Sequence, residues 1–177
     1  MKVKLASSAV PEGVWLRLPD HSLVNDGKPD EVDIALHELR VNSLEDCVLM
    51  DARCALPEAG NVMEQYADAQ ELVRDGSDLG CALEEQGQGM PNFMERYAAA
   101  LEFEHCHDLR LALDISQNLH CYEWVPCAGL WDFSRQKLLE AGYVLTADES
   151  AYIARNNLEF IRDWSAPEEA GPSMEQQ

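Results

Sequence analysis

The sequence is poor in basic residues: it has 13 Lys and Arg against 33 Asp and Glu in 177 residues, for a formal net charge of -20. A surface this acidic repels phosphate groups, which argues against direct binding to nucleic acid or to an anionic membrane. It attracts basic partners instead. Hydrophobic residues make up 46% of the chain, which excludes a disordered chain and places the charge on a folded surface.

Long apolar runs are also missing. No stretch of eighteen apolar residues occurs, so no transmembrane helix is expected. The short apolar run near the N-terminus is interrupted by Pro11 and Glu12 before it forms the core of a signal peptide. We therefore expect a cytoplasmic protein whose cysteines stay reduced, namely Cys47, Cys54, Cys81, Cys106, Cys121 and Cys127.

Motifs for catalysis or metal binding are absent. The sequence contains no C-x-x-C or H-x-x-x-H spacing, no glycine-rich phosphate loop, no G-x-S-x-G and no H-E-x-x-H. Cys106 lies between His105 and His107, but neighbouring residues of an extended chain point to opposite sides, and no oxyanion-stabilising element accompanies them. We expect no cofactor, no metal and no enzymatic activity, with a thiol or metal enzyme as the remotest alternative.

The first third of the chain predicts a hairpin, a helix and a strand. Residues 2–8 and 14–18 are two β-like runs separated by a Pro-Glu-Gly turn, and residues 19–29 form a loop. Asp30 is a suitable N-cap for a helix over residues 31–39. Residues 47–56 have the composition of a buried strand that ends at Pro57 and the Gly60 turn.

The middle of the chain predicts three helices and a strand. Asn61 can cap a helix that runs to Arg74, and the glycine-containing residues 76–89 indicate a flexible connection. A helix starts at Phe93, and Asp108 caps a second helix that ends at Asn118. Residues 120–125 then favour a short strand before a proline.

The last part predicts helices only. Residues 130–143 have an early Asp and a late Gly, as the capping preferences require, and two further helical pieces follow from Asp148 and over residues 157–164. The fold class is therefore α+β, an acidic protein of about three small packed α/β units. These are an N-terminal α+β unit over residues 1–60, a central helical unit over 61–103 and a C-terminal α+β unit over 104–165. A disordered tail over 166–177 follows.

Four segments of the sequence carry a resemblance to a known family. The most specific is residues 114–126, DISQNLHCYEWVP, which RYAAALEF precedes. The resemblance is weaker in EGVWLRLP and in VLMDARCALPEAGNVMEQYADAQELV. Together these segments resemble the ArdA-type antirestriction proteins, whose comparable segment joins a helix to an N-L-x-C-Y-[DE]-[FW]-x-P-like strand. The resemblance implies an elongated acidic protein of mobile genetic elements. Such proteins are DNA mimics that occupy the DNA-binding groove of type I restriction-modification enzymes. It also implies a homodimer, and we expect at least one of the aromatic residues Trp15, Tyr122, Trp124, Trp131 and Trp164 to seal it.

Under this resemblance, the carboxylates of residues 61–126 are the candidate phosphate mimics, because this third holds thirteen acidic and three basic residues. Spacings of three or four residues place the first four of them on one helical ridge. The simpler interpretation is a solvated acidic face, and the alternative function is an acidic adaptor that binds another basic protein. The candidates are Glu64, Asp68, Glu71, Asp75, Asp78, Glu84, Glu85, Glu95, Glu102, Glu104, Asp108, Asp114 and Glu123.

Overall fold

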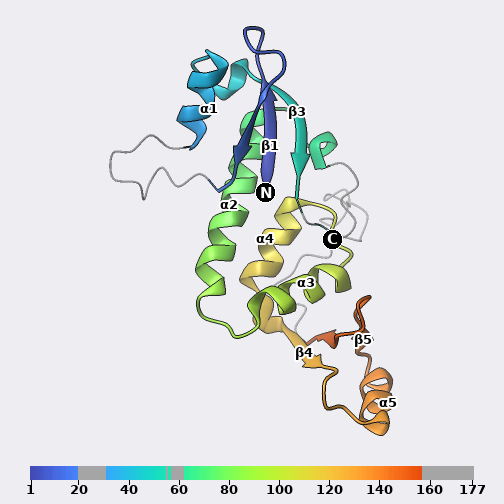
Figure 1. The fold of residues 1–177 in the computed structure, drawn as a ribbon. Coiled ribbons are helices and arrows are strands. Elements are labelled where there is room, and N and C mark those ends of the chain that lie inside the picture. Colours follow the sequence, from blue (N-terminus) through green and yellow to red (C-terminus); the bar gives the residue numbers. More distant parts are fainter. Residues whose placement is uncertain (20–30, 55, 57–61, 157–177) are drawn as a thin grey trace, which may run out of the picture.

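The computed structural model describes residues 1–19, 31–54, 56 and 62–156. The molecule is elongated, with one small sheet at each end and the helices α2, α3 and α4 between them (Figure 1). Both sheets have three antiparallel strands. The predicted α+β class is confirmed.

The N-terminal sheet contains β1 (Lys2–Ala6), β2 (Val14–Arg17) and β3 (Val48–Arg53) in the order β2-β1-β3. Alternation along the strands separates its two faces. Val3, Leu5 and Leu16 are buried in the core, whereas the intervening side chains point to the opposite face. Gly13, with φ 77°, closes the turn between β1 and β2, so the predicted hairpin is confirmed.

The prediction of a buried strand over residues 47–56 is wrong in its burial. β3 pairs only with β1 and so lies at an edge of the sheet, where Val48 and Met50 are exposed. The helix α1 (Glu31–Leu39) follows the prediction. The predicted cap Asp30, the loop over 20–29 and the turn at Pro57 and Gly60 lie outside the described residues.

The long helix α2 (Ala69–Gly87) corrects two predictions. The predicted helix from Asn61 to Arg74 is replaced by a short 3₁₀ helix, η2 (Val62–Gln65), and by α2, which begins after its N-cap Asp68. Residues 76–87 continue α2 instead of forming a flexible connection. A side chain at Gly76 would lie 2.6 Å from Leu18 Cδ1, so this glycine allows close packing of α2 against the sheet rather than a break in the helix.

The centre of the molecule agrees closely with the predictions. α3 (Phe93–Phe103) and α4 (Leu109–Gln117) are both present, and the side chain of Asp108 accepts a hydrogen bond from the backbone of Leu111 at 2.7 Å. Asn118 ends α4, and η3 (Leu119–Cys121) leads into β4 (Tyr122–Pro126). The predicted strand therefore begins two residues later than expected.

The C-terminal sheet has the order β4-β6-β5, with β5 (Val144–Leu145) and β6 (Ala151–Arg155). The predicted helix α5 (Asp132–Glu140) lies between β4 and β5. The helix predicted from Asp148 is wrong: Asp148 accepts hydrogen bonds from Thr146 and Ser150 in a tight turn, and the apolar run after it pairs with β4. The piece over 157–164 and the tail over 166–177 lie outside the described residues.

One hydrophobic core connects these elements, because its buried residues run from Val3 in β1 through the helices to Ile153 in β6. The division into units at residues 60 and 103 stays a prediction. All six cysteines are free. Across the described ranges, no helix is both long and apolar enough to span a membrane.

Candidate functional site: carboxylates of the helical centre

The candidate carboxylates come from η2, α2, α3, α4 and β4, and their surroundings divide them into two groups. The more buried group consists of Glu71, Asp75, Glu102, Glu104, Asp108 and Asp114. The exposed group consists of Glu64, Asp68, Asp78, Glu84, Glu85, Glu95 and Glu123.

Helix α2 presents a row of acids along one side. Glu71, Asp78 and Glu85 are seven residues apart, and two helical turns return to nearly the same side of a helix. Their Cα atoms are separated by about 10 Å along the helix axis at 1.5 Å per residue. Leu72, Val73 and Leu79 of α2 are buried in the core, which fixes the helix and its row of acids in place.

The single helical ridge predicted from Glu64 to Asp75 is wrong. Glu64 lies in η2, and Asp68 ends the preceding segment by capping α2, where its side chain accepts from Glu71 N at 2.9 Å. Asp75 turns inward: its side chain is only 12% exposed, accepts from the Tyr66 hydroxyl at 2.9 Å and lies 3.4 Å from Arg110 Nε. Burial and the hydrogen bond to Asp75 raise the pKa of Tyr66, so this phenol stays protonated.

Glu104 is more enclosed than Asp75 or Asp108. Its side chain is 8% exposed and forms a bidentate ion pair with Arg155 of β6, with Arg155 Nε at 2.6 Å. The Tyr122 hydroxyl also donates to this carboxylate. Burial lowers the pKa of the Arg155 guanidinium, but the hydrogen bond and the charge of Glu104, with a smaller contribution from Tyr122, together outweigh it, so the pKa of Arg155 is raised. Glu104 joins α3 to the C-terminal sheet.

Three further candidates also hold the fold together. Asp108 caps α4, Glu102 accepts from the backbone of Ala147 at 2.6 Å, and Glu123 accepts from the Tyr143 hydroxyl at 2.7 Å. Protein donors hold these three carboxylates in place. The acidic surface open to a partner is therefore smaller than predicted, and it is concentrated on α2 and the start of α3.

The histidine and cysteine cluster does not form a nucleophilic site. Cys106 is fully buried, its thiol donates to the backbone carbonyl of Asp108, and burial raises the pKa of the thiol to about 12. His107 lies outside on the surface, 3.6 Å from the Asp108 carboxylate. Among the residues that the structure describes, no three His, Cys, Asp or Glu side chains are grouped so that they could hold a metal ion.

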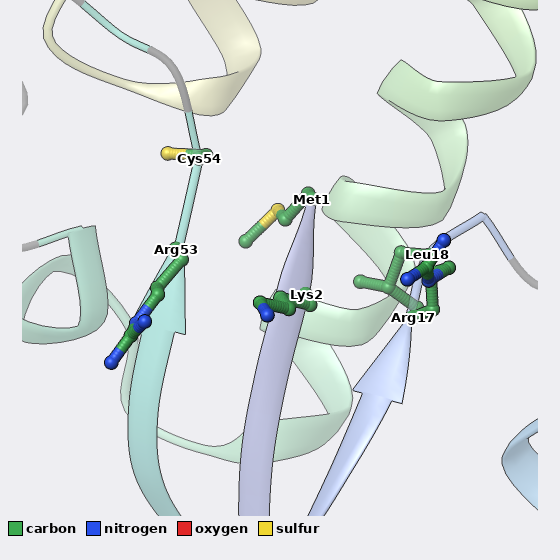
Figure 2. A pocket seen from close by; sticks show the side chains of 6 residues that line it. All are labelled: Met1, Lys2, Arg17, Leu18, Arg53 and Cys54. Carbon is green, nitrogen blue, oxygen red and sulfur yellow. The ribbon is translucent and has the colours of Figure 1, made fainter.

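The sequence interpretation missed a basic surface on the N-terminal sheet. Lys2, Arg17 and Arg53 lie at paired positions on three neighbouring strands, and they line an open hollow (Figure 2). A signal was present, because polar and apolar residues alternate in all three strands and place these cations on one face. The strand register that places them opposite one another could not be predicted from the sequence.

Compared with known proteins, the chain matches no family model, no curated protein and no solved structure. The resemblance to ArdA-type proteins thus rests on the segments quoted above. The function is argued from the site itself.

Proposed function

We propose that the protein is a DNA-mimic inhibitor of type I restriction-modification enzymes that acts in the cytoplasm and has no catalytic activity of its own. One observation carries the proposal. The acidic excess peaks in the helical centre, where residues 61–126 hold thirteen acids and three bases. Three of the exposed acids, Asp78, Glu84 and Glu85, lie on α2, a helix that packs against the core.

The electrostatic argument starts from DNA. Duplex DNA carries one negative charge per about 1.7 Å of its axis, so an enzyme that follows DNA needs a groove lined by lysine and arginine. An acidic protein is drawn into that groove and releases the ions held there. The acidic row of α2 repeats every 10 Å or so, about the rise of three base pairs at 3.4 Å each. Because the row is fixed before binding, little ordering entropy is lost.

Competition with DNA tests this proposal. The protein should displace a labelled duplex from a type I enzyme, and its affinity should fall steeply as salt rises. If the duplex stays bound at every concentration of the protein, or if the affinity does not change with salt, the protein is not a DNA mimic.

A charge-matched pair of variants tests the position of the surface. The first neutralises α2 through Glu71→Gln, Asp78→Asn, Glu84→Gln and Glu85→Gln, and the control neutralises four acids elsewhere, Glu12, Glu38, Glu45 and Glu140. At about 0.5 kcal/mol per charge, the α2 variant should lose about 2 kcal/mol of binding, or roughly thirtyfold. The control should lose clearly less. Equal losses would mean that net charge alone matters and would reject α2 as the contact surface.

The second candidate function is an acidic adaptor for another basic protein, and a specific surface favours it. None of the residues of α5 is buried, and Trp131, Phe133, Leu139 and Val144 expose about half or more of their area in and around it. Exposed apolar surface of this kind marks protein contacts. An adaptor would bind its partner through these side chains with weak dependence on salt.

The same apolar surface suits the homodimer that the resemblance implies. Trp131 and Phe133 pack edge to face with ring centroids 5.7 Å apart, so they form one apolar unit. We assign the second copy to this surface. Sedimentation equilibrium should show a dimer for the natural protein and a monomer for Trp131→Ser with Phe133→Ser; a dimer in both would place the contact elsewhere.

A further inference from the structure

Three cationic side chains lie in one row across the N-terminal sheet. Lys2 of β1 is directly opposite Arg17 of β2 on one side and Arg53 of β3 on the other. Residues directly opposite each other in antiparallel strands project to the same face. All three are exposed, and Figure 2 shows them on three neighbouring strands. With strands about 4.8 Å apart, the row is about 10 Å wide.

Trp15 gathers cations on this face. It lies opposite Lys4, and its ring centroid is 5.1 Å from Lys2 Nζ, 5.9 Å from Lys4 Nζ and 5.0 Å from Arg53 Cζ. The electron-rich face of an indole attracts cations at such distances. The ring therefore holds two cations of the row, Lys2 and Arg53, together with Lys4, beside one another before any ligand arrives.

The row places like charges next to one another, and it concentrates positive charge in a protein that is negative overall. Like charges directly opposite each other destabilise a sheet. The chain has 33 acids to neutralise 13 bases, yet among ion pairs between described residues only one involves this row, Arg53 with Asp51 at 3.4 Å. Asp51 itself is 43% exposed. An anion from outside would relieve the repulsion between the cations.

The row also borders a hollow of suitable size. Lys2, Arg17 and Arg53 line it together with Met1, Leu18 and Cys54, and its volume is about 560 Å³ (Figure 2). Small-molecule sites have volumes of about 300–1,000 Å³. Burial raises the pKa of the Cys54 thiol, so this side chain stays neutral and does not repel an anion.

We propose that this hollow binds a compact phosphate chain, such as a diphosphate or triphosphate, through Lys2, Arg17 and Arg53. Guanidinium groups hold phosphoryl oxygens with paired hydrogen bonds, and an ammonium group adds a point charge between them. The site is independent of the acidic surface on α2 and goes beyond the proposed function.

Charge selects a compact anion over a long one. A nucleic acid strand would extend past the row, which is about 10 Å wide, and meet the field of a protein with a net charge of -20. A triphosphate concentrates its charge within the row. Its two sources, the free inorganic chain and the chain of a nucleotide, share this chemistry.

Calorimetric titration with inorganic triphosphate at low salt tests the site. The natural protein should bind it, and Lys2→Gln with Arg17→Gln and Arg53→Gln should bind it about tenfold or more weakly, as expected when charge-assisted hydrogen bonds are lost. The control Arg40→Gln, Arg135→Gln and Lys137→Gln changes the net charge equally at exposed positions elsewhere. It should bind within about twofold of the natural protein.

Two further measurements make the outcome decisive. Triphosphate should raise the melting temperature of the natural protein, because a ligand of the folded state stabilises it. Adenosine triphosphate that binds as tightly as triphosphate identifies the phosphate chain as the ligand, and tighter binding identifies a nucleotide. The proposal is overturned if neither binds, if the two triple variants lose affinity equally, or if a single-stranded oligonucleotide binds where triphosphate does not.

Discussion

Glu104 and Glu95 stand nine residues apart at the end and the start of α3, yet their carboxylates have different surroundings. Glu95 is exposed, whereas Glu104 is enclosed by Arg155 and Tyr122. An enclosed carboxylate that balances a partly buried cation contributes to folding, and an exposed one contributes to the electrostatic field around the protein. The same residue type therefore serves two different purposes in this chain.

Removing the Glu104 carboxylate should destabilise the fold strongly. Glu104→Ala leaves the guanidinium of Arg155 without its bidentate partner, and breaking such a pair from one side costs about 3 kcal/mol. Glu95→Ala on the same helix should change stability by no more than about 0.5 kcal/mol. Urea unfolding measures both. Similar midpoints for the two variants would mean that the ion pair is not formed in solution.

The buried thiol of Cys106 should make the protein sensitive to alkali. Its pKa is raised by burial from 9.0 to about 12, so between these values the unfolded chain has lost this proton and the folded chain still holds it. The contribution of this thiol to the free energy of unfolding is then complete below about pH 9. Above that pH it falls by about 1 kcal/mol per pH unit.

Cys106→Ala isolates this contribution, since it removes the titrating group. Urea unfolding between about pH 9.5 and 11 should give a slope against pH that is shallower than in the natural protein by about 1 kcal/mol per unit. The absolute stability of the variant will be lower because of the cavity it leaves. Parallel slopes would show that the thiol is accessible to solvent in the folded state.

Which residue roles can be predicted depends on how far away the partner lies. Asp108 was identified as a helix cap because its partner, Leu111, is three residues away. The roles of Asp75 and Glu104 were missed because Arg110 and Arg155 are 35 and 51 residues away. Contacts between residues close in sequence can be predicted from the sequence, whereas contacts between distant segments cannot.

The helix α2 shows the same limit among the elements. Its glycines predicted a break in the helix. Gly76 and Gly80 instead face Leu18 and Pro19, where a side chain would collide with the neighbouring segment. Hairpins and capped helices such as β1-β2 and α4 were predicted because turns and caps lie within a few residues of each other. β6 was missed because its short apolar run becomes a strand only by pairing with β4.

Gly76→Ala should therefore destabilise the protein although alanine favours helices. The new methyl group would lie 2.6 Å from Leu18 Cδ1 and 2.9 Å from Met1 Sδ, and Leu18 is itself buried. Overpacking of this kind costs about 1–3 kcal/mol, against a gain of at most about 1 kcal/mol from helix propensity. A net loss should appear in urea unfolding.

Gly87→Ala is the matched control on the same helix. The nearest atom to its added methyl group is Phe93 Cδ2 at 3.6 Å, an ordinary contact, so stability should stay level or rise by up to about 1 kcal/mol. If Gly76→Ala stabilised the protein as much as Gly87→Ala does, α2 would not lie as close to the sheet as described.

At the scale of the whole molecule, residue counts predicted the sign of the surface charge but not which acids are open to a partner. The excess of acids was read directly from the counts, and so was their concentration in residues 61–126. Neither count showed that several of these acids are fixed by protein donors, nor that three cations align across the N-terminal sheet. Both arrangements depend on strand register and helix packing.

Added salt should raise the stability of this protein and weaken its inhibition of the enzyme. With a net charge of -20, the folded molecule repels itself, and salt screens that repulsion and raises the melting temperature. The same screening weakens attraction to a basic groove, so displacement of duplex DNA should become less efficient as salt rises. Sodium chloride is suitable because it has little of the general stabilising effect of sulfate.

One titration from about 20 mM to 500 mM sodium chloride, over which the Debye length falls from about 20 Å to 4 Å, measures both quantities. The α2 variant with four amides should show a smaller change in each, because it carries less charge to screen. A melting temperature that rises while inhibition stays constant would leave the acidic surface without a role in binding. The exposed apolar residues around α5 would then be the contact, and the protein would be an adaptor instead of a DNA mimic.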